Sequence, residues 1–434
     1  MTKNNLSQFW PLIPIGLTQI FVLSKIQFTP WPEMLLWPWL VNHGWLPFSD
    51  LIVAHAPLLY TSLALWYRVM GTGLVSLKIF TWSYIFLTAI ILWVIAAKQS
   101  GKKTATISVI FYALLQTVYQ GNGMWFDLGL APLILLAYYF LKSRQPVFAG
   151  VFFAVALFTK QTAFWLIVPV LLETIISRST KRFFVSVAAI SLIILTGLAA
   201  TRSLDNFYRW AIQAGVLNLS RTQWQSQWPA LSSATAFLFL PLAAAFLNPR
   251  LAPWILFASM GTFPRWELFH FQPAIPFIAL GLAQASIRNK RLFITLLVPL
   301  CLLYFKVLTR DWNRPDRFFD VDTLLAAKFI QVYTQPQDTL YVFNYWDHLY
   351  PLSNRLPATR PFVPGFPIFL NAPGIQEAII NNLQDKQPPY IIFHPLESSG
   401  YGSYQPQLIW RFLTQNYYLY NKISDQVWVL KRNN

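Results

Sequence analysis

Long apolar segments fill the first three-quarters of this chain. The first covers residues 9–27, and the others lie near 75–97, 104–119, 125–141, 146–158, 162–177, 182–200, 230–247, 251–264, 268–286 and 292–309. A helix that crosses a bilayer needs roughly 17–25 mostly apolar residues. The pattern therefore predicts an all-α polytopic membrane domain with about eleven spans over residues 1–309.

The pattern is interrupted near its middle. Segments 146–158 and 162–177 are both short, and the polar run Thr159-Lys160-Gln161 separates them. The two segments are either two short spans or one broken helix. Hydropathy alone leaves both alternatives open, because it measures composition and not chain direction.

The character of the chain changes at about residue 310. Residues 339–344, 390–394 and 427–431 have the apolar composition of short buried strands, and residues 375–383 and 407–415 have helical periodicity. We therefore expect residues 310–434 to form a small α/β domain. A core of this size is modest, so contacts with the membrane part would help to hold it.

Composition and charge agree with a membrane protein. Hydrophobic residues make up 55% of the chain and charged residues only 11%, whereas a soluble domain has about 25% charged residues. The net charge of +17 comes largely from basic clusters at 98–103, 142–144, 178–182 and 288–291, with Arg250 alone. Cytoplasmic loops of membrane proteins are rich in Lys and Arg, so we interpret the charge as a topology signal and expect no nucleic-acid partner.

The basic clusters also predict the orientation. If all of them are cytoplasmic, the N-terminus is inside and residues 310–434 are extracytoplasmic. This parity requires that residues 57–70 do not span the bilayer. That segment is short, and Trp66, Tyr67 and Arg68 suit an interfacial helix. It would lie within a long outer loop that covers residues 28–73.

Acidic residues are scarce before residue 310. There are six: Glu33, Asp50, Asp127, Glu173, Asp205 and Glu267. In the predicted topology only Glu173 lies near the inner end, and the other five face the outer side. A charge at bilayer depth is costly and usually faces a cavity or a partner. The pattern indicates a polar site at the outer membrane surface.

Three of these acids are candidate catalytic residues. Glu33, Asp50 and Asp127 follow outer-loop sequences, and a carboxylate there can act as a general base on an acceptor hydroxyl or bind a divalent cation. Ordinary alternatives exist for each. Glu33 can be a solvated loop charge, Asp50 a turn or cap residue, and Asp127 a helix-start charge favoured by the macrodipole.

Cationic and aromatic residues near the same surface are candidate substrate ligands. Lys160 would pair well with a lipid phosphate, although a snorkelling Lys has the same pattern. Arg265 and His270 could hold a leaving phosphate, and Trp266 could stack on a sugar; the ordinary alternative is an Arg265–Glu267 ion pair with interfacial aromatics. His55, in the outer loop, is the last of these candidate substrate ligands.

In order along the chain, these residues resemble the motifs of the GT-C superfamily of membrane glycosyltransferases, such as protein mannosyltransferases and aminoarabinose transferases. The matching elements are Pro32-Glu33, Gly44, Phe48-Ser49-Asp50, Ala56-Pro57-Leu58, Asp127, Thr159-Lys160-Gln161, His270-Phe271 and Pro276. The usual Asp-Glu pair is Pro-Glu here, and Phe twice replaces Tyr.

The resemblance implies a glycosyltransferase, for a hexose or a pentose, that takes a sugar from a polyprenyl-phosphate carrier in the membrane and moves it to an extracytoplasmic glycan, lipid or protein. It implies that Glu33 and Asp127 activate the acceptor, with Mg²⁺ or Mn²⁺ as a candidate cofactor on these two carboxylates. Two other classes remain open: a transporter or flippase of a lipid-linked glycan, and a non-catalytic membrane component that uses its C-terminal domain for protein contacts.

Overall fold

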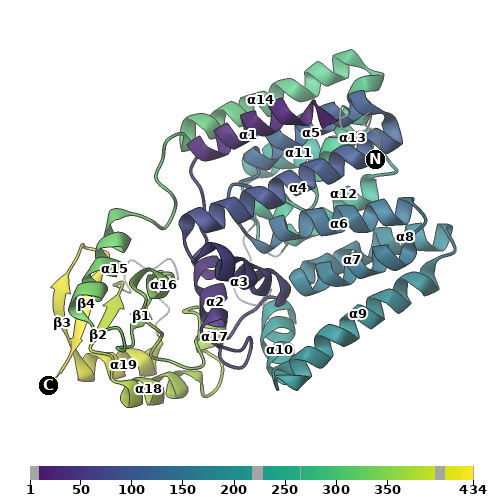
Figure 1. The fold of residues 1–434 in the computed structure, drawn as a ribbon. Coiled ribbons are helices and arrows are strands. Elements are labelled where there is room, and N and C mark those ends of the chain that lie inside the picture. Colours follow the sequence, from purple (N-terminus) through teal and green to yellow (C-terminus); the bar gives the residue numbers. More distant parts are fainter. Residues whose placement is uncertain (1–8, 218–227, 264, 396–405, 434) are drawn as a thin grey trace. The chain divides into compact units, whose positions relative to one another are not determined.

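The structure is a computed structural model that describes residues 9–217, 228–263, 265–395 and 406–433. It divides into two compact units (Figure 1). Unit 1 contains residues 1–29, 78–197 and 225–314, and unit 2 contains residues 30–77, 198–224 and 315–434. Each unit is described separately below.

Unit 1 is built from helices. They are α1 (Leu12–Lys25), α4 (Leu74–Ser100), α5 (Lys102–Val118), α6 (Phe126–Lys142), α7 (Pro146–Thr159), η3 (Gln161–Leu166), α8 (Ile167–Ile176), α9 (Thr180–Ala200), α11 (Leu231–Leu247), α12 (Ala252–Ser259), η6 (Met260–Thr262), η7 (Leu268–Phe271), α13 (Ile275–Arg288) and α14 (Lys290–Asp311). Helix α13 is buried along most of its length and packs against α5 and α11. An added Cβ at Gly281 would lie 3.3 Å from the Ala244 carbonyl oxygen, so this glycine permits close packing of α13 on α11.

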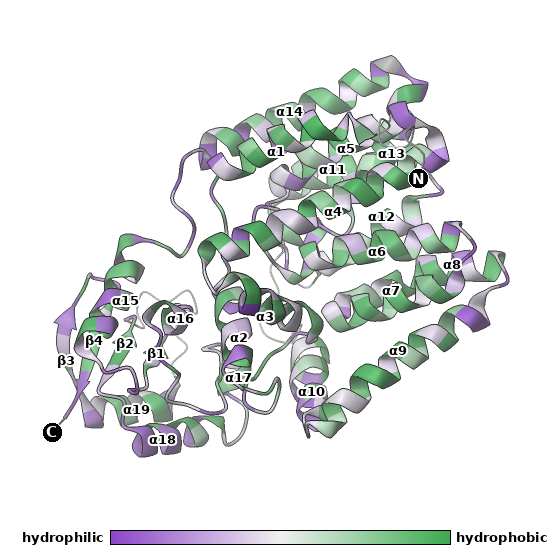
Figure 2. Cartoon of the chain, in the orientation of Figure 1, coloured by the Kyte–Doolittle hydropathy of each residue, from purple (hydrophilic) through white to green (hydrophobic). Residues whose placement is uncertain are grey.

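Apolar residues cover most of these helices (Figure 2). By length and composition, three helices of the described residues could cross a membrane: Leu74–Ser100, Thr180–Ala200 and Arg291–Asp311. Five shorter apolar helices, of 10–17 residues, accompany them. Membrane localisation is thus supported. The span count of about eleven stays a prediction, because it depends on how the shorter helices lie in the bilayer.

The basic loops of unit 1 meet at one end of the helices. Lys98 Nζ lies 3.0 Å from Ser143 Oγ, which joins the end of α4 to the end of α6. Ser100 Oγ accepts a hydrogen bond from Gln284 in the last turns of α13, and Gln284 also contacts Asn248, which follows α11. Gathering at one end is what the predicted topology requires of these loops. Which end faces the cytoplasm stays a prediction.

The interrupted segment around Lys160 reverses direction. Lys160, after α7, contacts Asp127 at the start of α6, whereas Glu173 of α8 forms a 2.5 Å ion pair with Lys142 at the end of α6. Helix α7 therefore runs antiparallel to α6, and η3–α8 runs back parallel to it. The reversal supports two short segments instead of one broken helix. Asp127 and Lys142 are 15 positions apart in α6, which corresponds to about 22 Å along the helix.

Unit 2 contains a four-stranded sheet in the order β1-β2-β4-β3. Strands β1 (Tyr341–Phe343) and β2 (Tyr390–Phe393) are parallel, and β4 (Trp428–Arg432) pairs antiparallel with β2 and β3 (Tyr417–Lys422). The helices are α2 (Pro32–Asn42), α3 (Leu58–Met70), α10 (Leu204–Phe207), η4 (Tyr208–Leu217), α15 (Val321–Tyr333), α16 (Leu349–Ser353), α17 (Pro367–Leu370), α18 (Ile375–Lys386) and α19 (Gln407–Asn416). The mostly helical chain with a small C-terminal sheet confirms the predicted classes of structure.

Residues 30–77 pack with the C-terminal domain. The Ile52 amide donates to the Phe362 carbonyl at 3.0 Å, and the Phe362 amide donates to the Asp50 carbonyl at 2.7 Å. The Ala54 carbonyl oxygen would lie only 2.4 Å from a Cβ at Gly215, so η4 also approaches this segment closely. The predicted boundary at residue 309 stays a prediction, because the compact unit around the sheet also includes much of the 28–73 loop.

Helix α3 is too short to cross a bilayer unaided. Its 13 residues give a length of about 20 Å, against a hydrocarbon core of about 30 Å. Leu59, Tyr60 and Leu63 are buried, while Leu65 and Val69 are exposed. An amphipathic helix of this length is compatible with the interfacial position predicted from the sequence.

We expect unit 2 to lose stability in mild acid through His348. This imidazole is fully buried, and burial lowers its pKa from 6.5 to about 4. The unfolded chain therefore binds a proton on His348 below pH 6.5 that the folded chain binds only near pH 4, so the contribution of His348 to stability is full above pH 6.5 and falls towards pH 4 by about 3 kcal/mol. Asp347, whose pKa burial raises, contributes with the opposite sign in this range, so the wild type is compared with His348→Asn. The wild type should lose stability relative to the variant by about this amount between pH 7 and 4; a difference that does not change with pH would contradict the assignment.

Candidate active site

The start of helix α6 carries a buried carboxylate in unit 1. Asp127 lies in the first turn of α6 and is fully buried. Amide groups in the first turn have no intrahelical acceptor and favour a nearby negative charge. This helix end stabilises Asp127 but does not by itself neutralise a buried carboxylate.

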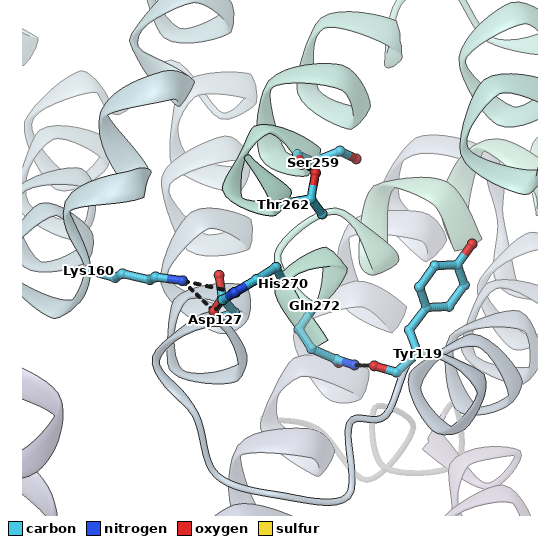
Figure 3. A network of polar contacts seen from close by, with 7 residues as sticks. All are labelled: Tyr119, Asp127, Lys160, Ser259, Thr262, His270 and Gln272. Atoms are coloured by element: carbon cyan, nitrogen blue, oxygen red, sulfur yellow. Dashed lines mark hydrogen bonds and ion pairs between the residues drawn. The ribbon is translucent and has the colours of Figure 1, made fainter. Parts of the chain in front are cut away.

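Two other elements supply the partners of Asp127 (Figure 3). Lys160 Nζ lies 2.5 Å from Asp127 Oδ2, and His270 Nδ1 lies 2.7 Å from the same oxygen. The helical geometry ends at Lys160, whose backbone is extended, and this break directs its side chain towards α6. His270 comes from the short helix η7. Three predicted site residues thus meet at one point.

The cluster is nearly closed to solvent. Lys160 is 4% exposed and His270 is 8% exposed. An ionised Asp127 and Lys160 balance each other, and His270 Nδ1–H can donate to Oδ2 as a neutral imidazole. The second carboxylate oxygen, Oδ1, has no hydrogen-bond partner among the described residues and faces Gly261, where an added Cβ would lie 3.4 Å away. Oδ1 is therefore the carboxylate oxygen that neither Lys160 nor His270 contacts.

A glycine-flanked turn before α6 positions this carboxylate. Asn122 Nδ2 donates to the carbonyl groups of Leu23, Ile26 and Gln27, and Gln272 Nε2 donates to the Tyr119 carbonyl at 2.8 Å. Sequence analysis did not identify Asn122 or Gln272 as supporting residues. The sequence feature that could have identified Asn122 is the run Gly121-Asn122-Gly123, because both glycines lie where a Cβ would collide with neighbouring atoms.

The other unit 1 candidates lie on the segment before η7. Arg265 forms a 3.0 Å ion pair with Glu267, and its side chain is 40% exposed. Its Nε is buried without a hydrogen-bond partner among the described residues. Arg265 is also close enough to act electrostatically on Lys160 and His270. The Trp266 ring packs edge-on against Phe271 at 5.4 Å.

The remaining candidates belong to unit 2. Glu33 lies half-buried in the first turn of α2. Asp50 accepts hydrogen bonds from the Leu46 amide at 2.9 Å and from Arg360 of the C-terminal domain at 2.7 Å. The Arg360 guanidinium lowers the pKa of Asp50. The His55 ring lies 6.4 Å from Trp37. The structure thus gives Asp50 a structural partner, and its catalytic role stays a prediction.

We expect the Asp50–Arg360 ion pair to act as a clamp, that is, to hold the 28–73 loop against the C-terminal domain within unit 2. Because the pair is partly exposed, removing it should cost about 1 kcal/mol or less. Asp50→Asn and Arg360→Gln should each lower the stability of the protein slightly and to a similar extent. Thermal unfolding of both variants tests this, and Asp50→Asn/Arg360→Gln should cost no more than either single change. A much larger loss in one single variant than in the other would contradict the clamp.

The Asp127 cluster is a poor fit for a divalent cation. Among the described residues there is no group of three or more His, Cys, Asp or Glu side chains that could hold a metal. Asp127 Oδ2 is already bound by Lys160 and His270, and an ammonium group repels a metal ion at the same oxygen. Asp127 is therefore not assigned as a metal ligand, and the Mg²⁺ or Mn²⁺ expected from the sequence stays a prediction.

Comparison with known structures decides the fold. No family model and no curated protein matches the sequence. The structure is similar to ArnT from Cupriavidus metallidurans bound to undecaprenyl phosphate, with TM-score 0.62, 13% identity and 96% of each chain covered. Apo ArnT gives TM-score 0.63, 13% identity and 98% coverage of each chain. The chain has the GT-C fold.

A second GT-C protein is more distant. The archaeal oligosaccharyltransferase AglB from Archaeoglobus fulgidus, in complex with an inhibitory peptide and a dolichol-phosphate, gives TM-score 0.50 and 11% identity, with 89% of this chain and 70% of AglB covered. The GT-C fold is thus common to this chain, an aminoarabinose transferase and an oligosaccharyltransferase. This confirms the fold that the sequence motifs implied.

Proposed function

We propose that this protein is an integral-membrane glycosyltransferase that moves a sugar from a polyprenyl-phosphate carrier to an extracytoplasmic acceptor. The observation that carries the proposal is the Asp127–Lys160–His270 cluster within a GT-C fold. ArnT binds undecaprenyl phosphate in one of the similar structures, and AglB is in complex with dolichol-phosphate in another. Both ligands are polyprenyl phosphates.

The leaving lipid phosphate would be held by Arg265 and Lys160. Negative charge grows on this phosphate as the glycosidic bond breaks, and preorganised cationic donors stabilise that charge. The Arg265 side chain is partly exposed, so its guanidinium is suited to bind a phosphate oxygen directly. Lys160 shares its ammonium with Asp127. Its role is to complete the positive field and to position the carboxylate.

The acceptor would be activated by a carboxylate. Glu33 is our candidate general base, since it lies half-buried at a helix start in unit 2. Proton removal makes the acceptor hydroxyl a better nucleophile at the anomeric carbon. Asp127 Oδ1, which has no hydrogen-bond partner in the described part of the chain, would accept a hydrogen bond from a sugar hydroxyl. His55 and Trp266 are kept as further candidate contacts for the substrates.

The transporter alternative is less well supported. Secondary transporters bind their substrates near the bilayer midplane, where repeated halves of the protein meet. In this chain the Asp127 cluster lies at one end of α6, and the ion pair at its other end joins only Lys142 and Glu173. A cluster at one end of the bundle is better suited to chemistry at a membrane surface.

A transfer assay tests the proposal. The purified protein in proteoliposomes would receive radiolabelled polyprenyl-phosphate mannose, glucose or aminoarabinose and a detergent extract of cell-envelope glycolipids. We expect release of polyprenyl phosphate together with a labelled product. The test variant is Arg265→Gln, which removes the cation while retaining hydrogen-bonding groups. Release of polyprenyl phosphate should fall at least tenfold in this variant. Movement of intact donor across the bilayer without cleavage would overturn the proposal in favour of a flippase.

A further inference from the structure

Three aromatic side chains in unit 2 form a continuous face. The Trp31 and Phe318 rings lie 5.7 Å apart, and the Phe318 and Trp346 rings lie 4.6 Å apart. They come from three places in the sequence: the residue before α2, the segment before α15, and the segment before α16. Trp31 and Phe318 are partly exposed, and Trp346 is 40% exposed. We call Trp31, Phe318 and Trp346 the aromatic face.

The backbone at the centre of this face is strained. Phe318 has a φ of +66°, in the left-handed region that bulky residues rarely adopt. Such a conformation persists only when the surroundings enforce it. His348 provides that support: its Nε2 donates to the Phe318 carbonyl at 2.9 Å, and its ring stacks on Phe319 at 5.0 Å. The His348 contact therefore stabilises the backbone conformation from which the Phe318 side chain projects.

Two polar side chains adjoin the aromatic face. The Arg317 guanidinium lies over the Trp31 ring, 5.5 Å from its centroid, and over the Phe318 ring, 4.9 Å from its centroid, and the residue is exposed. Asp347 follows Trp346 directly and is half-buried. Burial and the negative charge of Glu33 raise the pKa of Asp347 well above its usual value, which favours the protonated carboxyl group. A protonated carboxyl both donates and accepts hydrogen bonds.

This combination differs from ordinary domain packing. Aromatic rings that serve only as core are buried, as Phe343 and Phe393 are in the adjacent sheet. Here a large indole remains exposed, beside an exposed guanidinium and the half-buried carboxyl group of Asp347. Binding sites for small polar ligands have this composition: apolar or aromatic walls with a few polar groups that fix orientation.

We propose that the exposed Trp346 indole of the aromatic face, with Arg317 and Asp347 beside it, binds a sugar ring of the acceptor glycan. One face of a pyranose presents C–H groups that pack against the electron-rich face of an indole. Its hydroxyl groups would accept hydrogen bonds from Arg317. They would both donate hydrogen bonds to the Asp347 carboxyl group and accept them from it. The role of this site as an acceptor site rests on the proposed transferase function, whereas sugar binding itself does not.

Saturation-transfer difference NMR tests the binding without any donor. The full protein in lipid nanodiscs would be titrated with methyl α-mannoside, methyl β-glucoside, methyl β-galactoside, maltose and lactose. We expect at least one of them to receive saturation, with affinity about tenfold weaker in Trp346→Ala and in Arg317→Ala. The matched control is Tyr418→Ala, because Tyr418 is also an exposed aromatic residue of unit 2, at 46%, on strand β3. Its binding should be unchanged.

The outcomes separate this inference from the proposed function. If the protein binds a sugar through Trp346 but has no transferase activity, the sugar-binding site is supported and the proposed transferase function is rejected. If wild type and Trp346→Ala transfer the sugar with the same acceptor KM, the transferase function is supported and the sugar-binding site is rejected. No saturation of any of the five sugars, or equal binding in Trp346→Ala at unchanged thermal stability, would also overturn the site.

Discussion

Replacing Asp127 by Ala will both abolish sugar transfer and destabilise the protein by about 3–5 kcal/mol. The loss of stability follows from the contacts: Lys160 is buried with Asp127 as its charge partner, so the substitution leaves an uncompensated buried ammonium. Thermal unfolding in detergent and a transfer assay measure the two effects. Because a destabilised protein also loses activity, this single variant cannot by itself assign a chemical role to Asp127.

The double variant Asp127→Asn/Lys160→Gln separates the two effects. It removes both charges while amide groups of similar size can still hydrogen-bond, so we expect most of the stability to return. Transfer should remain absent, since neither the carboxylate nor the cation is present. If the double variant regains both stability and activity, the cluster is only structural. The control is Lys142→Gln/Glu173→Gln, which removes the ion pair at the opposite end of α6 and should retain activity.

Much of the fold could be predicted from apolar patterns. Residues 339–344, 390–394 and 427–431 were predicted as strands and form β1, β2 and β4; residues 375–383 and 407–415 form most of α18 and α19. Strand β3 was not predicted. Five of its six residues, all except Tyr417, are exposed, so no alternation of buried and exposed positions marks it. Strand β3 is stabilised by its antiparallel pairing with β4, which the local sequence does not reveal.

The site could be predicted residue by residue, but its contacts could not. Scarcity of acids identified Asp127, and the polar interruption of an apolar run identified Lys160. Their pairing joins residues 33 apart in the chain, and the pairing of Asp127 with His270 joins residues 143 apart. Such contacts depend on how helices pack, which periodicity does not report. The sequence associated Lys160 with a lipid phosphate, whereas the structure also gives it a carboxylate partner.

We expect Glu33→Gln to reduce transfer by about 10²–10⁴-fold with little change in stability. A general base contributes a factor of this size when it removes a proton in the transition state. Glutamine retains the shape and can still accept a hydrogen bond, but it does not take a proton at neutral pH. The fall should appear in kcat, with the donor KM nearly unchanged, because the amide still fills the position of the carboxylate.

The matched control is Glu377→Gln, since Glu377 also lies in the first turn of a helix of unit 2, α18, and is exposed. Each substitution removes a negative charge near a helix N-terminus and should cost about 0.3–1 kcal/mol. The two variants should therefore unfold at similar temperatures, while only Glu33→Gln loses activity. Near-normal turnover in Glu33→Gln would remove Glu33 from the mechanism. The acceptor would then need another base, and Asp127, whose Oδ1 has no hydrogen-bond partner among the described residues, is the carboxylate to test next.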